Sequence, residues 1–265
     1  MALLGRIFAD AQEDEYVRTS PVSLRRRKAD KGKGTRTGRA LDPAIAQLLL
    51  AECEDDDDLR LVILVALLAG VRRGELFALD WPSIDFDKDI IHVRHSLHWA
   101  YGRFHKKADD QRTKAVIDTP KTKGSVRDID LNPELKKELR TRYLKSKDKA
   151  GLIFRSREGG PIDPGNFVSR KFFPAVESAI EKAEKAKDDA AVKALDGLHF
   201  HDLRHTFGSW LVAQGEDILY VSAQLGHARP SITADVYSHL LKARRPDAAR
   251  KMANLLFGKA ATAAD

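Results

Sequence analysis

Two pairs of polar residues in this sequence could act together on an anionic substrate. Arg72 and Glu75 lie three residues apart after a hydrophobic run, and His201 and Arg204 have the same spacing further along the chain. Residues three apart share a face of a helix, so Glu75 can hold the guanidinium of Arg72, and His201 and Arg204 can converge on one ligand. Taken alone, the first pair is more typical of a surface salt bridge at a helix end.

A lysine and a tyrosine extend this set of polar residues. Lys121 stands in PKTKG between two predicted strands, where a hairpin could carry it into a neighbouring groove. Lysine and glycine are also common in any exposed turn. His227 ends an LGH stretch, and Tyr237 follows ten residues later. A tyrosine in a helix near the C-terminus is usually a packing residue, so nothing about Tyr237 alone marks it as a nucleophile.

The closely spaced histidines His199, His201 and His205 raise the alternative of a metal site. A zinc site generally needs four ligands, or three and a water, and no cluster of carboxylates or cysteines stands ready to complete one here. The sequence therefore favours chemistry without a metal, and we expect neither a metal nor a cofactor.

In this order, the polar stretches resemble the catalytic domain of the tyrosine recombinases, the phage integrase family. The matching text is GVRRGEL, PKTKGSVRDIDL, FHDLRHTFGSWLVAQGED and LGHARPSITADVYSH. The resemblance extends from about Arg39 to about His239, and HDLRHTF followed by LGH and VYSH is a specific signal. It implies a site-specific DNA recombinase or integrase that cleaves and rejoins strands through a covalent 3′-phosphotyrosyl intermediate.

The resemblance assigns catalytic roles to six residues, with Tyr237 as the nucleophile. Arg72 is preferred to its neighbour Arg73 because the family's arginine directly follows the Gly-Val pair, and Lys121 is preferred to Lys123. The full set is Arg72, Lys121, His201, Arg204, His227 and Tyr237.

These residue types suit attack on a phosphodiester. Arginine stays protonated and offers its donors in a planar fork, which stabilises charge on the non-bridging oxygens. A phenol with an ordinary pKa of about 10 must lose its proton as it attacks, and His201 or the local positive field can assist. His227 would bond the phosphate or help with that proton, and Lys121 would protonate the departing 5′ oxygen. Because the tyrosyl ester conserves the bond, rejoining needs no nucleotide.

The elements that position these residues form a mainly α fold with a small antiparallel β-sheet. Helix starts are predicted at Asp42, Asn132, Asp163, Asp217 and Pro230–Ser231, and a buried helix ends at Gly70. Strands are predicted over 85–99, 114–117 and 125–131 within one sheet, with a short strand over 151–155. Residues 178–196 are typical of a solvated helix or helical hairpin.

Composition agrees with a DNA partner. The 265 residues carry a formal charge of +7, and residues 18–39 are dense in Lys and Arg with one acid, Asp30. A solvated arm without a partner is the alternative interpretation. The single cysteine, Cys53, excludes an internal disulfide and suits a reducing cytoplasm. No signal peptide is visible and the longest apolar run is too short to span a bilayer, so we expect a cytoplasmic protein without a membrane segment.

Four segments are predicted along the chain. Residues 1–21 resemble the last helix of a mostly absent N-terminal core-binding domain, 22–40 are a basic interdomain linker, and 41–240 are the catalytic domain. Residues 241–265 form a C-terminal helix and tail, with apolar Met252, Leu255, Leu256 and Phe257. That segment could dock on a neighbouring protomer or fold back on its own domain. The resemblance implies a tetramer on double-stranded DNA and a monomer free in solution.

Three other functions compete with recombination. A type IB topoisomerase uses similar residues, but the LGH and HDLRHTF stretches favour a recombinase. A catalytically silent DNA-binding module is disfavoured because every expected catalytic position is occupied, and a metal-dependent nuclease would lose its activity in EDTA. The target sequence is not evident, since phosphate contacts carry no sequence information.

Overall fold

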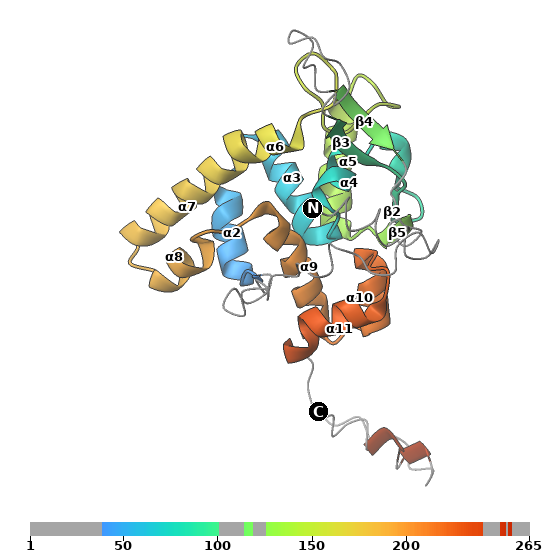
Figure 1. Cartoon of the computed structure of the whole chain (residues 1–265), viewed down its shortest axis with the longest axis vertical. Coiled ribbons are helices and arrows are strands. Elements are labelled where there is room, and N and C mark those ends of the chain that lie inside the picture. Colours follow the sequence, from blue (N-terminus) through green and yellow to red (C-terminus); the bar gives the residue numbers. More distant parts are fainter. Residues whose placement is uncertain (1–38, 101–113, 119–125, 241–249, 253, 256–265) are drawn as a thin grey trace, which may run out of the picture. The chain divides into compact units, whose positions relative to one another are not determined.

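The computed structural model describes residues 39–100, 114–118, 126–240, 250–252 and 254–255 (Figure 1). The chain divides into two compact units, Met1–Thr37 and Gly38–Asp265, and all described residues belong to the second. The predicted N-terminal helix, the linker up to residue 38 and the PKTKG stretch with Lys121 lie outside the described residues. The four-segment division of the chain stays a prediction.

Helices make up most of the described fold, and their starts follow the local sequence signals. Asp42, Asn132, Asp163 and Asp217 each cap a helix by accepting a hydrogen bond from a backbone N–H of its first turn, as predicted. The α-helices are α2 (Pro43–Ala51), α3 (Asp57–Ala69), α4 (Arg73–Phe77), α5 (Pro133–Lys145), α6 (Pro164–Phe167), α7 (Phe173–Lys185), α8 (Asp189–Leu195), α9 (Phe200–Gln214), α10 (Ile218–Leu225) and α11 (Pro230–Tyr237). Shorter helical turns are η2 (Trp81–Ser83), η4 (Val168–Phe172) and η5 (Ser238–Leu240).

The described strands are antiparallel, as predicted, but they form two small sheets instead of one. The first contains β1 (Ile84–Asp85), β2 (Ile90–Val93) and β5 (Arg127–Asp130) in the order β1-β2-β5, and the second pairs β3 (Ser96–Ala100) with β4 (Lys114–Asp118). In the first sheet Ile91 faces Ile129, and in the second Leu97 faces Ile117.

The prediction of one strand over 85–99 is wrong. The chain turns after β1, where the backbone N–H groups of Asp87 and Lys88 donate to the Asp85 carboxylate at 3.1 and 2.9 Å, and Asp89 adopts a left-handed φ of 58°. An aspartate that bonds its own backbone in this way favours a turn over a strand. The run ends again between Val93 and Ser96, where the chain passes from one sheet to the other.

Two further sequence predictions need correction. Residues 151–155 join neither sheet as a strand, because Leu152 and Arg155 make only isolated bridges to Asp80 and Pro161. The segment 178–196 is a helical hairpin, as predicted, made of α7 and α8. It is not wholly solvated, since both of its helices contact α2 and both carry buried apolar residues: Ala179, Ala183, Ala191 and Leu195.

Helix α9 organises the candidate site because it contacts α3 on the main core and α10 on the other side (Figure 1). It also holds the first described residues of the chain in place. The Thr206 hydroxyl accepts from the Leu41 N–H at 3.0 Å, and the Trp210 indole donates to the Leu41 carbonyl at 2.9 Å. One turn earlier, the Asp202 carboxylate accepts from the Arg39 N–H at 3.4 Å. Residues 202, 206 and 210 lie on one face of a helix, which leaves other faces for chemistry.

Within the part of the chain that is described, no helix is both long enough and apolar enough to span a membrane.

Candidate active site

Arg204 is buried at the centre of the site. Only 4% of the residue is exposed, and its guanidinium donates to the Gly70 carbonyl at 2.6 Å and to the Leu225 carbonyl. Burial, followed by the charges of Arg72 and Arg127, lowers the pKa of Arg204 to about 9. The side chain is still a cation at neutral pH, and this crowding of positive charge favours a bound anion.

Gly70 allows the close approach that Arg204 requires. It ends α3 in the left-handed conformation with φ of 58°, and a Cβ there would lie 2.2 Å from the Phe207 ring. Phe207 stands on α9 beside Arg204, so glycine lets the end of α3 come within hydrogen-bonding distance of the guanidinium.

Arg72 lies at the N-terminal cap of α4 and is held by Glu75, as the spacing suggested. Its guanidinium donates to the Glu75 carboxylate at 2.6 Å, and its backbone N–H donates to the other carboxylate oxygen at 2.8 Å. Glu75 is 2% exposed. Burial alone would raise the pKa of Glu75, but hydrogen bonds and charge from Arg127 and Arg72 keep this pKa below its usual value. Glu75 is therefore a buried carboxylate that fixes Arg72.

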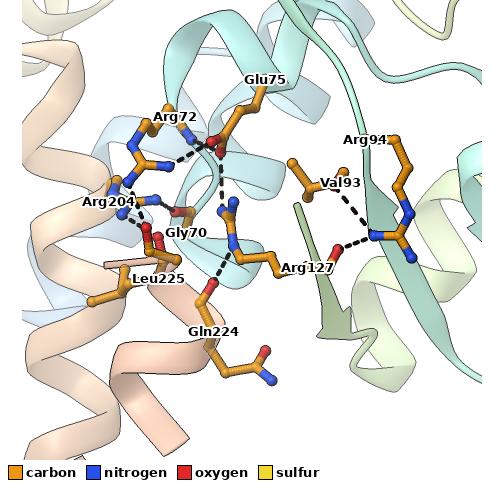
Figure 2. Close-up of polar contacts among 10 residues, drawn as sticks. Gly70, Arg72, Glu75, Val93, Arg94, Arg127, Arg204, Gln224 and Leu225 are labelled. Carbon is orange, nitrogen blue, oxygen red and sulfur yellow. Dashed lines mark hydrogen bonds and ion pairs between the residues drawn. The ribbon is translucent and has the colours of Figure 1, made fainter. Parts of the chain in front are cut away.

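A third arginine, which the sequence analysis did not single out, joins this group. Arg127 on β5 donates to Glu75 at 3.0 Å and to the Gln224 carbonyl at 2.7 Å. Arg72 also donates to the Gly226 carbonyl at 2.7 Å. Figure 2 shows the three guanidiniums gathered between Glu75 and the end of α10. We call Arg72, Arg127, Arg204 and Glu75 the arginine cluster.

His227 lies two residues after the end of α10 and follows its C-terminal cap, Gly226. Its Nδ1 lies 2.7 Å from the hydroxyl of Thr233, which is fully buried in α11. Burial, then the positive charges of Arg204 and Arg72, lower the pKa of His227 to about 4. The ring is therefore neutral at pH 7. If Nδ1 accepts from the threonine hydroxyl, Nε2 carries the proton and can donate to a phosphate oxygen.

Tyr237 is the last residue of α11 and is 2% exposed. Its hydroxyl lies 3.4 Å from Nδ1 of His205, a long hydrogen bond. Burial raises the pKa of Tyr237 to about 12, although the charge of Arg204 acts in the opposite direction. Gly208 forms the wall of this pocket, since a Cβ there would lie 2.5 Å from the tyrosine hydroxyl. We call Tyr237, His205 and Gly208, with the apolar side chains around them, the tyrosine pocket.

The two histidines of α9 differ in position. His201 is exposed, whereas His205 is half-buried, and their rings meet edge to face with centroids 4.8 Å apart. Burial of part of its ring, together with His205 and Arg204, lowers the pKa of His201. From the sequence, the phenol proton is expected to pass with the help of His201, His227 or the local positive field, and His205 is only a possible metal ligand. In the structure the histidine at the phenol hydroxyl is His205.

The closely spaced histidines do not form a metal-binding group. Among the described residues, no three His, Cys, Asp or Glu side chains are arranged to hold a metal ion. His199 instead precedes α9 as its N-terminal cap residue, and its backbone N–H donates to Asp202 at 2.8 Å.

The site thus joins residues that are distant in sequence. Arg72 comes from α4, Arg204 from α9, His227 from the loop after α10 and Tyr237 from α11. Two fixed guanidiniums and a neutral imidazole can bind the oxygens of a phosphodiester. The phenol of Tyr237, from α11, lies against His205 of α9, the helix that also carries Arg204. Lys121 lies outside the described residues, and its role at this site stays a prediction from the sequence.

Comparison with known proteins places this geometry in context. The family model described as the phage integrase family matches residues 39–244. The chain is 28% identical over 257 residues to the ICEBs1 integrase of Bacillus subtilis, covering 97% of this chain and 64% of that protein. It is 27% identical over 202 residues to a protein named tyrosine recombinase XerC-like from Caldanaerobacter subterraneus, covering 74% of this chain and 49% of that protein. The chain thus spans less than two thirds of either relative.

A solved structure shows the same fold. The integrase of transposon Tn1549, in complex with a circular intermediate DNA, matches with a TM-score of 0.69 and 22% sequence identity. The match covers 94% of this chain and 75% of that integrase chain.

Proposed function

The chain belongs to the phage integrase family, and from this premise we propose that it cleaves and rejoins DNA strands as a site-specific recombinase or integrase. The reaction would pass through a covalent 3′-phosphotyrosyl intermediate. One observation carries the proposal. Arg72 and Arg204, from helices far apart in sequence, donate to the carbonyls of adjacent residues, Gly226 and Leu225, and so meet at one place beside His227.

The arginines would bind the scissile phosphate. Each guanidinium keeps donors in a plane that matches two non-bridging oxygens, and protein carbonyls and Glu75 hold both forks before DNA arrives. Fixed donors stabilise the charge that develops during attack without the cost of reorientation. His227, neutral at pH 7, would add a further donor to the same phosphate.

Tyr237 would be the nucleophile. Its oxygen forms a bond to phosphorus as the bond to the 5′ oxygen breaks, and the phenol proton passes to a neutral histidine. His205 lies at the phenol hydroxyl, and His201 is next to His205. Since the phenol is 2% exposed, it must leave its pocket to reach a phosphate. Lys121, matched from the sequence, would donate the proton that the 5′ oxygen takes up.

Double-stranded DNA is the proposed substrate and the main partner. The related Tn1549 integrase is described in complex with DNA, and this chain has a formal charge of +7. We propose that residues 41–240 form the catalytic domain, with 1–21 and 22–40 as the end of a core-binding domain and its linker. Residues 241–265 would join protomers into a DNA-bound tetramer. Met252 and Leu255 in this segment are 67% and 81% exposed, which leaves them accessible to a partner. A buried, unpaired Cys53 suits a cytoplasmic location.

A nicked suicide substrate, which releases a short 5′-hydroxyl fragment on cleavage, tests the proposal directly. Wild type should form a DNA adduct that survives denaturant and forms equally well in EDTA, while Tyr237→Phe should form none. Tyr143→Phe is the matched control, because Tyr143 packs against Trp81 away from the site and should leave the adduct unchanged. An adduct formed by Tyr237→Phe, or none formed by wild type on any substrate, would overturn the proposal.

A further inference from the structure

The backbone carbonyls at the end of α10 accept hydrogen bonds from several arginines. Helix α10 ends at Leu225, and Gly226 follows it in the left-handed conformation with φ of 63°. The final carbonyls of a helix have no partner within it and lie at the negative end of the helix dipole. Here the carbonyls of three consecutive residues each accept from a different arginine: Gln224 from Arg127, Leu225 from Arg204 and Gly226 from Arg72.

We propose that Arg127 is a positioning residue for the phosphate-binding arginines, acting through Glu75 and through the end of α10. This inference rests on the proposed DNA cleavage and assigns a residue to it that the sequence motifs did not.

The first link runs through Glu75. One carboxylate oxygen accepts from the Arg72 guanidinium at 2.6 Å, and the other accepts from Arg127 at 3.0 Å. The side chains of Glu75 and Arg127 are 2% and 6% exposed, whereas 36% of the Arg72 side chain is exposed. The buried pair therefore lies behind the arginine that faces solvent. A carboxylate this deeply buried keeps its charge only while it is paired, so Arg127 maintains the group that orients Arg72.

The second link runs through the helix end. Nε of Arg127 donates to the Gln224 carbonyl at 2.7 Å, one residue before the carbonyl that accepts from Arg204. Further bonds fix α10 to β5, since the Asp130 N–H donates to the Gln224 side chain at 3.1 Å and the Tyr220 hydroxyl donates to Asp130 at 2.7 Å. Figure 2 shows Arg127 between Glu75 and the Gln224 carbonyl. Strand β5 thus holds the end of α10, whose carbonyls accept from Arg72 and Arg204.

Direct contact between Arg127 and DNA does not fit this arrangement. Its guanidinium is engaged with Glu75 and Gln224 inside the fold, and the residue is 9% exposed. To reach a phosphate it would have to abandon Glu75. Its expected effect is therefore on the rate of cleavage and not on the affinity for DNA.

The test compares Arg127→Met with Arg127→Lys in single-turnover cleavage of a nicked suicide substrate at saturating DNA. Displacing catalytic groups by about 1 Å costs about 100-fold in rate, so we expect Arg127→Met to cleave about 100-fold more slowly. DNA affinity at fixed salt should stay within about two-fold of wild type, because the residue makes no surface contact. Lysine keeps the charge beside Glu75 but loses the fork, and it should recover part of the rate.

The pH profile separates positioning from simple support of the fold. The charged groups that act on Glu75 or are acted on by it are Arg72, Arg127 and Arg204, from α4, β5 and α9. Without Arg127, burial should raise the pKa of Glu75, so acidification should protonate it and release Arg72. The cleavage rate of Arg127→Met should therefore fall at acidic pH. Wild type and Arg127→Lys should not show this fall. Adding Glu75→Gln should remove this pH dependence.

Arg94→Met is the matched control. Arg94 donates to the Arg127 carbonyl at 2.7 Å and pairs with Asp128, so the variant removes a neighbouring arginine without touching Glu75. It should cleave like wild type. The inference falls if Arg127→Met loses activity only in proportion to its folded fraction, keeps the wild-type pH profile, or loses DNA affinity in parallel with rate. If Arg127→Met does not fold, a wild-type rate for Arg127→Lys overturns it. Failure of wild type to cleave would instead overturn the proposed function.

Discussion

The arginine cluster and the tyrosine pocket both rest on α9, yet their side chains are held in different ways. In the arginine cluster, Arg204 donates to two carbonyls and Glu75 binds two arginines, so the guanidiniums have defined directions. Tyr237 instead sits in a small apolar cluster, separate from the main core, with Phe207, Val212, Val221 and Leu225. Its hydroxyl makes a long hydrogen bond to His205, at 3.4 Å.

This difference suggests a division of labour. Hydrogen bonds with defined directions hold the groups that must fit a phosphate, and such groups are effective when they are fixed in advance. Apolar packing is not directional, so a side chain held mainly by it can leave at the cost of its buried area. The groups proposed to bind phosphate are thus fixed in advance, while the proposed nucleophile is buried in an apolar pocket.

Replacing Arg204 by lysine should produce the largest effect. Lysine keeps the charge but lacks the planar fork, so it cannot hold the Gly70 and Leu225 carbonyls and still present donors to a phosphate. Loss of one fixed donor costs about 100- to 1,000-fold in rate, and we expect cleavage by Arg204→Lys to fall by about 1,000-fold. Single-turnover adduct formation measures this.

Arg142→Lys provides the comparison, since Arg142 pairs with Asp58 in a half-buried contact between α5 and α3. It should cleave at the wild-type rate. If Arg204→Lys also cleaved within ten-fold of wild type, charge alone would suffice, and the fixed geometry of the arginine cluster would not matter.

Gly208→Ala should disturb the tyrosine pocket and leave the arginine cluster in place. The added methyl would lie 2.5 Å from the Tyr237 hydroxyl and 3.0 Å from Leu225, so the phenol must shift. Overpacking of this kind costs about 1–3 kcal/mol of stability. A displaced phenol regains water, so its pKa should fall from about 12 towards the ordinary value of about 10. Ultraviolet titration, with Tyr237→Phe subtracted, reports this pKa.

The cleavage rate of Gly208→Ala should change by less than about ten-fold, because the phenol leaves this pocket before it reacts. Gly160→Ala is the control, since its nearest neighbour to an added Cβ is the Ser156 hydroxyl at 3.8 Å. An unchanged pKa of Tyr237 in Gly208→Ala, or a loss of rate as large as in Arg204→Lys, would show that the two regions are not held differently.

The sequence predicted well those features that depend on a few neighbouring residues. An acid or asparagine before a helix caps it within three residues, and this local signal identified the starts of α2, α5, α6 and α10. The Arg72–Glu75 contact is also local, because both residues belong to the same helix start. The strands were less predictable, since their break depends on a turn at Asp89 and on pairing with distant partners.

The contacts that assemble the candidate site could not be read from the sequence. Arg127 and the carbonyl it binds are 97 residues apart, and a backbone carbonyl carries no mark in the amino-acid sequence. Arg127 lies in PKTKGSVRDIDL, one of the stretches that resemble the family, and this is the signal by which the sequence could have pointed to it. The burial of Tyr237 likewise depends on Gly208 from another helix. The residue types were enough to predict attack on a phosphodiester. Which side chains are held in place depends on backbone contacts between segments far apart in the sequence.

The smallest expected effect is a loss of stability on mild acidification, caused by histidines near the arginine cluster. The pKa of His227 is about 4 in the folded chain, against an ordinary value of about 6.5 when unfolded, and the pKa of His201 is lowered in the same direction. Between these values the unfolded state binds more protons, so stability rises with pH across this window and is lost as pH falls through it. The carboxylates with lowered pKa, such as Glu75 and Asp56, lose their contribution only below about pH 4.5.

The melting temperature followed by circular dichroism should therefore be constant from pH 8 to 7 and should decrease from pH 7 to 5. His227→Asn removes one of the responsible groups, so its melting temperature should decrease less over the same interval, whatever its value at pH 7. A wild-type melting temperature that stays constant down to pH 5, or a parallel decrease in both proteins, would contradict the depressed pKa of His227. Because burial and the charges of Arg204 and Arg72 cause that depression, such a result would also mean that the arginine cluster is more open to water than its contacts indicate.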